Sequence, residues 1–425
     1  MVAMNIQVKP PLTPAETALV AAFGERLSLL PGDAAVALKR DDAIEMVKAG
    51  LPTRRVEAWH YTDLRRLLTS VPAFDATRNA KTVDPLLEGS SVLPVLDGVA
   101  ARRFAPIGGV SVKRLGEMLQ DGSFAPALEL SGSDDAVGAI NTAFVADGFF
   151  LDIEDGAAPE APIELQNVQD GGQSHVRLPV RIGAGAKATI VERQTGSGAA
   201  LVSSVSNVTI GDDAEVLWLI VQQQPDSATY LGQFNAELGK NAKLTLFVMN
   251  AGGKLVRQEI RVVAKGEGGT FTLRGVNLIS GDAHCDVTMT LDHAAPHTGS
   301  TEVIRNVVTG RGHGVFQGRI NVHQKAQKTD AKMACNTLLL SDDGEFSTKP
   351  ELEIFADDVQ CGHGATVTEI EASHLFYLMA RGIDEKTARG LLVKAFVAEV
   401  IEELDEEPIV EALEGVLNEW FATHG

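Results

Sequence analysis

The chain has 425 residues and a net charge of −20, with 44% hydrophobic and 22% charged residues. This size allows two or three domains, and the composition excludes a disordered chain. The electrostatic field of this net negative charge repels the phosphate backbones of nucleic acids and the headgroups of anionic lipids. We therefore expect no nucleic-acid partner and no membrane partner.

The cysteine content and the N-terminus bear on the cellular compartment. Cys285, Cys335 and Cys361 are too few for a disulfide framework and odd in number, which favours a reducing compartment. The N-terminus lacks a basic stretch followed by an apolar run, and the apolar runs are too short to cross a bilayer. The expected location is therefore the cytoplasm, without a signal peptide.

Residues 1–145 are expected to form a mostly helical domain. Apolar residues at helical spacing predict amphipathic helices over residues 13–30 and 41–49, and Gly50 is a suitable stop for the second.

Residues 146–365 are rich in Val, Ile, Thr and Gly and contain an internal repeat. A turn residue followed by an alternating strand recurs at equal intervals, starting at Gly185, Asp213, Asn241 and, more weakly, Gly269. A fixed period indicates units that stack on their neighbours. The spacing is short for a propeller blade, so the segment predicts a right-handed parallel β-helix of roughly eight coils. An ordinary β-sandwich with a chance repeat is the alternative.

The same period predicts which side chains face the core. Side chains at the same position of successive coils form a column along the rod. One column is expected inside the rod and comprises Ala188, Val216, Leu244 and Thr272. The neighbouring column is expected in solvent and comprises Lys187, Glu215 and Lys243. The repeat fades after residue 275, so the later coils are inferred from composition alone.

Residues 366–425 are expected to form a C-terminal helical domain. Helices are predicted over 368–381, from Asp384 to about residue 403, and from Pro408 onward. The apolar face of the last helix is too broad for an isolated hairpin, so it has to pack on its own domain or on a partner.

Motifs for common catalytic chemistry are missing from the sequence. There is no GxxxxGK[ST] P-loop, no GxSxG and no HExxH, so we expect no nucleotide to bind this chain and no enzyme activity. Many β-helices cleave acidic polysaccharides, and such an enzyme is the alternative. The aromatic content of 5% and the missing secretion signal argue against it.

Two residue pairs that contain histidine are weak candidates for a metal site. His293 and His297 are four apart, but they lie among Ala, Pro and Gly in an expected loop between strands. His284 and Cys285 are adjacent, so on a strand they point to opposite faces.

Cys361 and His363 form the strongest candidate site. On a strand they face the same way, and Gly362 between them lets another chain or a cluster come close. Thiolate and imidazole are good iron ligands, but two ligands do not complete a site, so a partner chain would supply the rest. From spacing alone, a buried cysteine beside a capping or turn histidine remains the alternative.

A longer stretch around these residues resembles the shared core of the SufB/SufD family. Its motifs are Ala326–Ala331, Asn336–Ser341, Lys349–Ile354, Ala356–Val359, Cys361–Thr366, Leu375–Leu378, Arg381–Ile383 and Ala388–Arg389. Near the N-terminus, Leu51–Pro52 and Arg55–Leu64 resemble the helical domain of the D-type members. The resemblance spans most of the chain and is most specific in its C-terminal block.

The resemblance implies a non-catalytic subunit of an iron–sulfur cluster assembly scaffold. It implies a β-helix flanked by helical domains, which pairs with a SufB-type paralogue and docks a SufC-type ATPase through its C-terminal helices. His363 then corresponds to the D-type interface histidine, and Cys361 to the neighbouring cysteine. Iron or a nascent cluster would be held there transiently, and no role is implied for Cys285 or Cys335.

Within this family the choice between B and D types rests on three features. The Trp59–Leu64 motif, the moderate length and the lack of a cysteine before Cys285 favour the D type. A B-type scaffold that works as a homodimer is the alternative, and the isolated chain could also form a homodimer.

Overall fold

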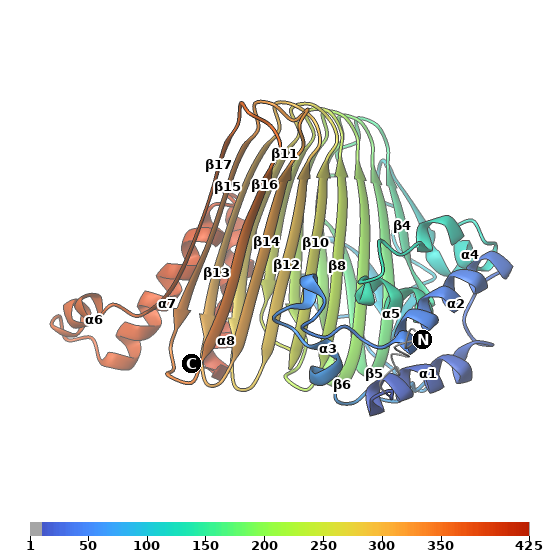
Figure 1. Ribbon diagram of the computed structural model, residues 1–425, viewed down its shortest axis with the longest axis horizontal. Coiled ribbons are helices and arrows are strands. Elements are labelled where there is room, and N and C mark those ends of the chain that lie inside the picture. Colours follow the sequence, from blue (N-terminus) through green and yellow to red (C-terminus); the bar gives the residue numbers. More distant parts are fainter. Residues whose placement is uncertain (1–10, 425) are drawn as a thin grey trace, which may run out of the picture.

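The computed structural model describes residues 11–424 and consists of a rod of stacked β coils with helices along two of its sides (Figure 1). The helices are α1 (Pro14–Arg26), α2 (Ala34–Ala49), α3 (Leu64–Leu67), α4 (Leu115–Gln120), α5 (Ala136–Phe144), α6 (Ala372–Met379), α7 (Glu385–Glu402) and α8 (Glu407–His424), with 3₁₀ turns η1 (Glu57–Trp59) and η2 (Ala125–Leu128).

The first three strands lie between α3 and α4 along the chain, and all later strands lie between α5 and α6. They are β1 (Ser91–Leu96), β2 (Val99–Ala100), β3 (Val110–Arg114), β4 (Asp147–Ile153), β5 (Ile163–Ile182), β6 (Lys187–Ile210), β7 (Glu215–Gln223), β8 (Thr229–Leu238), β9 (Lys243–Asn250), β10 (Leu255–Ala264), β11 (Thr270–Ile279), β12 (His284–His293), β13 (Gly299–Val308), β14 (His313–Val322), β15 (Asp330–Leu339), β16 (Glu345–Ile354) and β17 (Gln360–Glu369).

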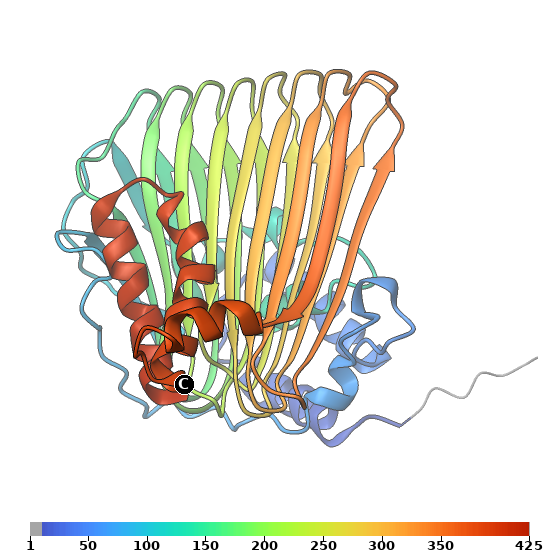
Figure 2. The ribbon, with the colours of Figure 1, turned by 90° about the vertical axis from the view of Figure 1, so that its left-hand side faces the viewer.

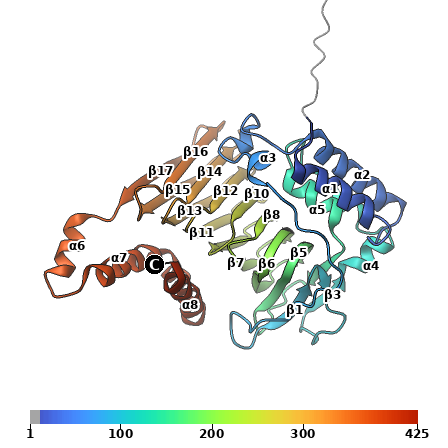
Figure 3. The ribbon, with the colours of Figure 1, turned by 90° about the horizontal axis from the view of Figure 1, so that it is seen from below.

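Alternate strands build the two walls of the rod. From β6 onward each strand pairs in parallel with the strand two places along the chain, so β7, β9, β11, β13, β15 and β17 line one wall and β8, β10, β12, β14 and β16 the other. Figure 3 shows the two walls from below. The prediction of a parallel β-solenoid is confirmed, with about 8 turns. The β-sandwich alternative is wrong, because sandwich sheets are antiparallel.

The predicted core column is right for three of its four members. Ala188 pairs with Val216 and Val216 with Leu244, and all three side chains are buried. Leu244, however, pairs with Phe271 and not with Thr272, because this coil is one residue shorter than the coils before it. The solvent column is also confirmed, since Lys187, Glu215 and Lys243 are exposed.

Coil length explains why the repeat fades. The column continues from Phe271 through Ser300 and Ala331 to Cys361, and these steps along the chain are unequal in length. The strands keep their length, so the extra residues lie in the turns. A turn can change length without disturbing the stacked strands, and this breaks a fixed-period pattern while the fold continues.

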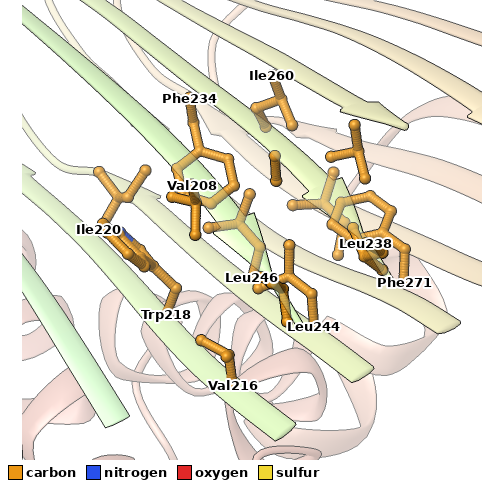
Figure 4. Close-up of a cluster of buried hydrophobic side chains, with 14 of the residues drawn as sticks. Val208, Val216, Trp218, Ile220, Phe234, Leu238, Leu244, Leu246, Ile260 and Phe271 are labelled. Atoms are coloured by element: carbon orange, nitrogen blue, oxygen red, sulfur yellow. The ribbon is translucent and has the colours of Figure 1, made fainter. Parts of the chain in front are cut away.

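Large apolar side chains from both walls fill the rod. In Figure 4, Trp218 and Leu246 of one wall lie close to Phe234 of the other, and these side chains are fully buried. The Trp218 and Phe234 rings meet edge to face, with centroids 5.2 Å apart.

A second inner column is polar over most of its length, between Val95 at one end of the rod and Val367 at the other. Its members are Asn167, Gln194, Gln222, Asn250, Asn277, Asn306 and Thr337, and all are buried. The side-chain amide of Asn250 donates to the side-chain oxygen of Asn277, and that of Asn277 to Asn306, each at 2.8 Å. This ladder satisfies polar groups inside the rod and fixes how the coils stack.

The N-terminal helices cover the wall that contains β8 and β10. Helices α1, α2 and α5 share a buried apolar cluster with Leu201, Leu231 and Leu255 of β6, β8 and β10. The predicted N-terminal helices have different limits: the first ends at Arg26, and the second begins at Ala34 behind an Asp33 cap.

The C-terminal helices α7 and α8 lie across the opposite wall (Figure 2). Their buried residues, such as Val397 and Leu413, pack on Leu219, Phe247 and Val276. The helix predicted over 368–381 is wrong at its start, since β17 continues to Glu369 and α6 begins at Ala372. Residues 368 and 369 remain in the strand because they pair with β15.

Strand β1 pairs in parallel with β5, so one strand of the rod comes from the N-terminal segment. The division at residues 145 and 365 remains a prediction. Within residues 11–424, no helix is long and apolar enough to cross a membrane.

Candidate functional site

The last coil of the rod carries both predicted site residues. Cys361 and His363 lie in β17, opposite Ala331 and Met333 of β15. Ala331 and Met333 are buried in the core, so the same side of β17 faces the rod interior. Cys361 and His363 therefore share the inner face of the last coil, which agrees with the predicted common face.

This end of the rod is open. Among residues 11–424, β17 has a parallel partner only in β15, and β16 only in β14. Ile354 and Val367 also face inward, yet each is 41% exposed, whereas Val322 and Thr337 beneath them are buried. The hydrophobic core of the rod therefore reaches solvent at this end.

The two candidate side chains differ in exposure. The Cys361 thiol is partly buried against the core, and His363 is exposed. Burial raises the pKa of Cys361, and the negative charge of Asp330 raises it further. The isolated chain therefore keeps this thiol protonated at neutral pH, and iron or a cationic partner would have to displace the proton.

Gly362 and Gly364 face outward between the inner-facing residues. A Cβ built at either position meets no atom within 4 Å, so the outer face of β17 is open here. The expectation that Gly362 permits close approach of another chain stays a prediction.

Within residues 11–424, no three His, Cys, Asp or Glu side chains are grouped so that they could hold a metal. Cys361 and His363 offer two donors, whereas an iron–sulfur cluster is usually held by four protein ligands. This end of the rod therefore offers fewer donors than such a cluster needs.

The other two cysteines also face the interior, which sequence reasoning missed. The side-chain amide of Asn306 donates to the Cys335 sulfur at 3.3 Å, and Cys285 contacts Asn277 at 3.9 Å. Burial raises the pKa of Cys335 to about 11 and that of Cys285 further. Only the strand register could have revealed that Cys335 lies one coil below Ala365.

The weaker histidine candidates have structural partners. His293 ends β12, so its predicted place in a loop is wrong, and its Nδ1 lies 2.8 Å from the Thr298 hydroxyl. His297 lies in the following turn with φ 57°. His284 and Cys285 face opposite sides as predicted, and His284 Nε2 lies 2.8 Å from the Thr62 hydroxyl.

The chain is similar to proteins of iron–sulfur assembly. A family model described as "SUF system FeS cluster assembly, SufBD core domain" matches residues 165–396, more than half of the chain. The iron–sulfur cluster assembly protein SufD of Escherichia coli is 27% identical over 378 residues, which cover 85% of this chain and 88% of that protein.

Two further relatives are similar. The protein ABCI7, chloroplastic, of Arabidopsis thaliana is 27% identical over 406 residues, which cover 87% of this chain and 83% of that protein. A SufBD family protein of Synechocystis, slr0076, is 30% identical over 200 residues, which cover 47% of this chain and 44% of that protein.

Proposed function

Because the chain belongs to the SufBD family of the SUF iron–sulfur cluster assembly system and is similar to SufD over most of its length, we propose that it is a non-catalytic scaffold subunit. In this role Cys361 and His363 supply part of a ligand set that a second subunit completes. The observation that carries the proposal is the position of both donors on the inner face of an open last coil.

The second subunit is a SufB-type paralogue that pairs at this end of the rod. The unpaired edges of β16 and β17 can accept further strands, as exposed sheet edges do. Ile354 and Val367 leave the core open, so another apolar coil end would cover them. Two stacked rods of the same fold satisfy both requirements, and a homodimer of this chain would do so in the absence of the paralogue.

The substrate held between the two subunits is iron or a nascent iron–sulfur cluster. Thiolate and imidazole are both ligands of iron–sulfur centres. The Cys361 thiol loses its proton when iron binds, and His363 binds through a neutral ring nitrogen.

A SufC-type ATPase is the partner proposed for the C-terminal helices, since this chain contains no P-loop. Helix α6 buries none of its residues, and its Phe376 and Tyr377 are 73% and 56% exposed. Exposed aromatic side chains on one short helix are typical of a protein interface. We place the assembly in the cytoplasm, where three unpaired cysteines stay reduced.

The test is anaerobic cluster reconstitution on the complex co-expressed with the paralogue and the ATPase. We expect His363→Ala and Cys361→Ala each to lower bound iron and sulfide several-fold, with the complex still assembled. His323→Ala is the matched control, because this exposed histidine lies in the turn after β14 and its Nε2 lies 3.3 Å from Asp292 of β12, not beside a residue of β17. Wild-type cluster content in both site variants would reject the proposed ligands.

A further inference from the structure

The charge of the rod changes sign from one coil to the next near its open end. The coil of β12 and β13, residues 280–309, contains four acidic residues and one basic residue. The next coil, residues 310–341 with β14 and β15, contains five basic residues and one acidic residue. The last coil, residues 342–369 with β16 and β17, contains eight acidic residues and one basic residue, Lys349. The rod therefore ends on a strongly acidic coil.

Ion pairs join neighbouring coils along the outside of the rod. Arg311 of the basic coil donates through Nε to the Asp282 carboxylate of the coil before it, at 2.7 Å. In the last coil, the one cation Lys349 is already paired with Glu351 of its own strand and with Glu57 of the N-terminal segment. The cations that neutralise the rest of this acidic coil therefore have to come from a neighbouring coil.

The basic coil neutralises only part of the last coil. The Arg319 guanidinium lies 3.3 Å from the Glu351 carboxylate and 3.7 Å from that of Glu353. Lys328 pairs with Asp358. Within residues 11–424 the other five acidic side chains of the last coil form no ion pair, and all are exposed: Asp342, Asp343, Glu345, Asp357 and Glu369.

These five carboxylates lie at the strand ends of the last coil. Asp342 and Asp343 lie in the turn before β16, Glu345 is the first residue of β16, Asp357 lies in the turn after it, and Glu369 is the last residue of β17. The strand edges and the hydrophobic core are open at the same coil. The last coil therefore lacks a neighbour for its backbone, its core and its charge alike.

We infer that the coil which covers the open end carries basic side chains, and that it belongs to the paralogue and not to a second copy of this chain. A second copy would cover the strand edges and the core, but it would bring a second set of unpaired carboxylates into the same interface. Like charges at an interface oppose association, whereas complementary charges speed it and select the partner. The inference rests on the function proposed above, since it describes the surface that the paralogue presents.

The first test is self-association of the purified full chain, measured by sedimentation equilibrium at about 0.05 M and about 0.5 M NaCl. Salt screens the repulsion between two open ends, so the wild type should dimerise more tightly at the higher concentration. The rim variant combines Asp342→Asn, Asp343→Asn and Glu345→Gln. We expect it to dimerise at least tenfold more tightly than the wild type at low salt, because half or more of the repelling carboxylates are gone.

The second test is binding of the purified paralogue, measured by surface plasmon resonance at the same two salt concentrations. Attraction between unlike charges predicts the opposite response, so the wild type should bind the paralogue less tightly as salt rises. At low salt the rim variant should bind the paralogue at least tenfold less tightly than the wild type, with slower association.

The matched control combines Glu25→Gln, Asp41→Asn and Asp42→Asn, which remove the same net charge from exposed positions on α1 and α2. It should change neither self-association nor paralogue binding. Equal dimerisation of the wild type and the rim variant at low salt, or equal affinity of the two for the paralogue, would overturn the inference. A wild-type chain that does not bind the paralogue at all would instead reject the proposed pairing, and the self-association test would still show whether the rim carboxylates repel.

Discussion

At the scale of single residues, the direction in which a side chain faces determines its chemistry. Cys361 has core residues on one side and an open coil end on the other, so its thiol is partly buried and still reachable. Cys335 and Cys285 face the same interior but lie beneath further coils. Three cysteines of one rod therefore differ in reactivity because of their depth.

The cysteines should react with iodoacetamide in a fixed order. Only the thiolate reacts, and burial raises the pKa of all three thiols, least severely where the coil is open. We expect Cys361 to be labelled slowly at pH 7 and about tenfold faster per pH unit below its pKa, with the other two labelled only after unfolding. Peptide mass spectrometry measures this order, and native labelling of Cys335 at the rate of Cys361 would contradict it.

Glu302 should make stability depend on pH. Burial raises its pKa to about 8 in the folded chain, against an ordinary value of 4.5. Between these values the folded chain holds a proton that the unfolded chain has released, so stability falls as pH rises from 4.5 to 8. The total loss is on the order of 5 kcal/mol.

Replacing Glu302 with Gln removes this dependence. The melting temperature of Glu302→Gln should exceed that of the wild type by more at pH 8.5 than at pH 6. Thermal unfolding followed by circular dichroism measures the two differences. Equal differences at the two pH values would mean that Glu302 has an ordinary pKa in the folded chain.

At the scale of elements, the N-terminal motif is held on the rod by buried charge. The Arg257 guanidinium of β10 lies 4.2 Å from the centre of the Trp59 ring, and its Nη2 donates to the Ala58 carbonyl at 2.7 Å. Arg257 also pairs with Asp286 of β12 at 2.5 Å. The motif that resembles D-type members therefore anchors the N-terminal segment to this wall.

Trp59→Ala should destabilise the protein by roughly 3–5 kcal/mol, because it empties a fully buried site and uncovers a buried cation. His60→Ala alters the exposed neighbouring residue and should cost less than about 0.5 kcal/mol. Urea unfolding of both variants tests this difference. Similar urea midpoints for Trp59→Ala and His60→Ala would show that Trp59 does not anchor this segment.

Helix α6 should matter for partner binding and not for folding. Phe376→Ala combined with Tyr377→Ala removes exposed aromatic surface, so the melting temperature should stay unchanged while affinity for the ATPase falls at least tenfold. Leu29→Ala, at a 71% exposed site in the N-terminal segment, is the control for loss of apolar surface. Titration calorimetry measures the affinity of the α6 double variant and of the Leu29→Ala control for the purified ATPase. Unchanged affinity in the α6 variant would show that helix α6 is not the docking surface.

At the scale of the whole molecule, the solenoid could be predicted because the first coils share a length. Their constant period correctly stacks Ala188, Val216 and Leu244. From Phe271 onward the coils differ in length, because their turns differ in length. The stacking of Ser300, Ala331 and Cys361 therefore could not be predicted from a constant spacing in the sequence.

The candidate site could be predicted only in part, because the sequence does not show which residues are neighbours in successive coils of unequal length. Cys361 and His363 could be paired because they are two residues apart on one strand, which requires no register. Cys335 could not be connected to them, because its relation to them passes through a neighbouring coil. The open core at Ile354 and Val367 likewise depends on which coil is last.

The central claim is that a second subunit covers the open end of the rod at Cys361. Cysteine-specific cross-linking of the co-expressed complex with a short bis-maleimide tests it most directly, with Cys361→Ser as the control. A covalent adduct between this chain and the SufB-type paralogue that disappears in Cys361→Ser is the predicted result. An assembled complex in which Cys361 forms no cross-link and is alkylated as fast as in the isolated chain would contradict the account.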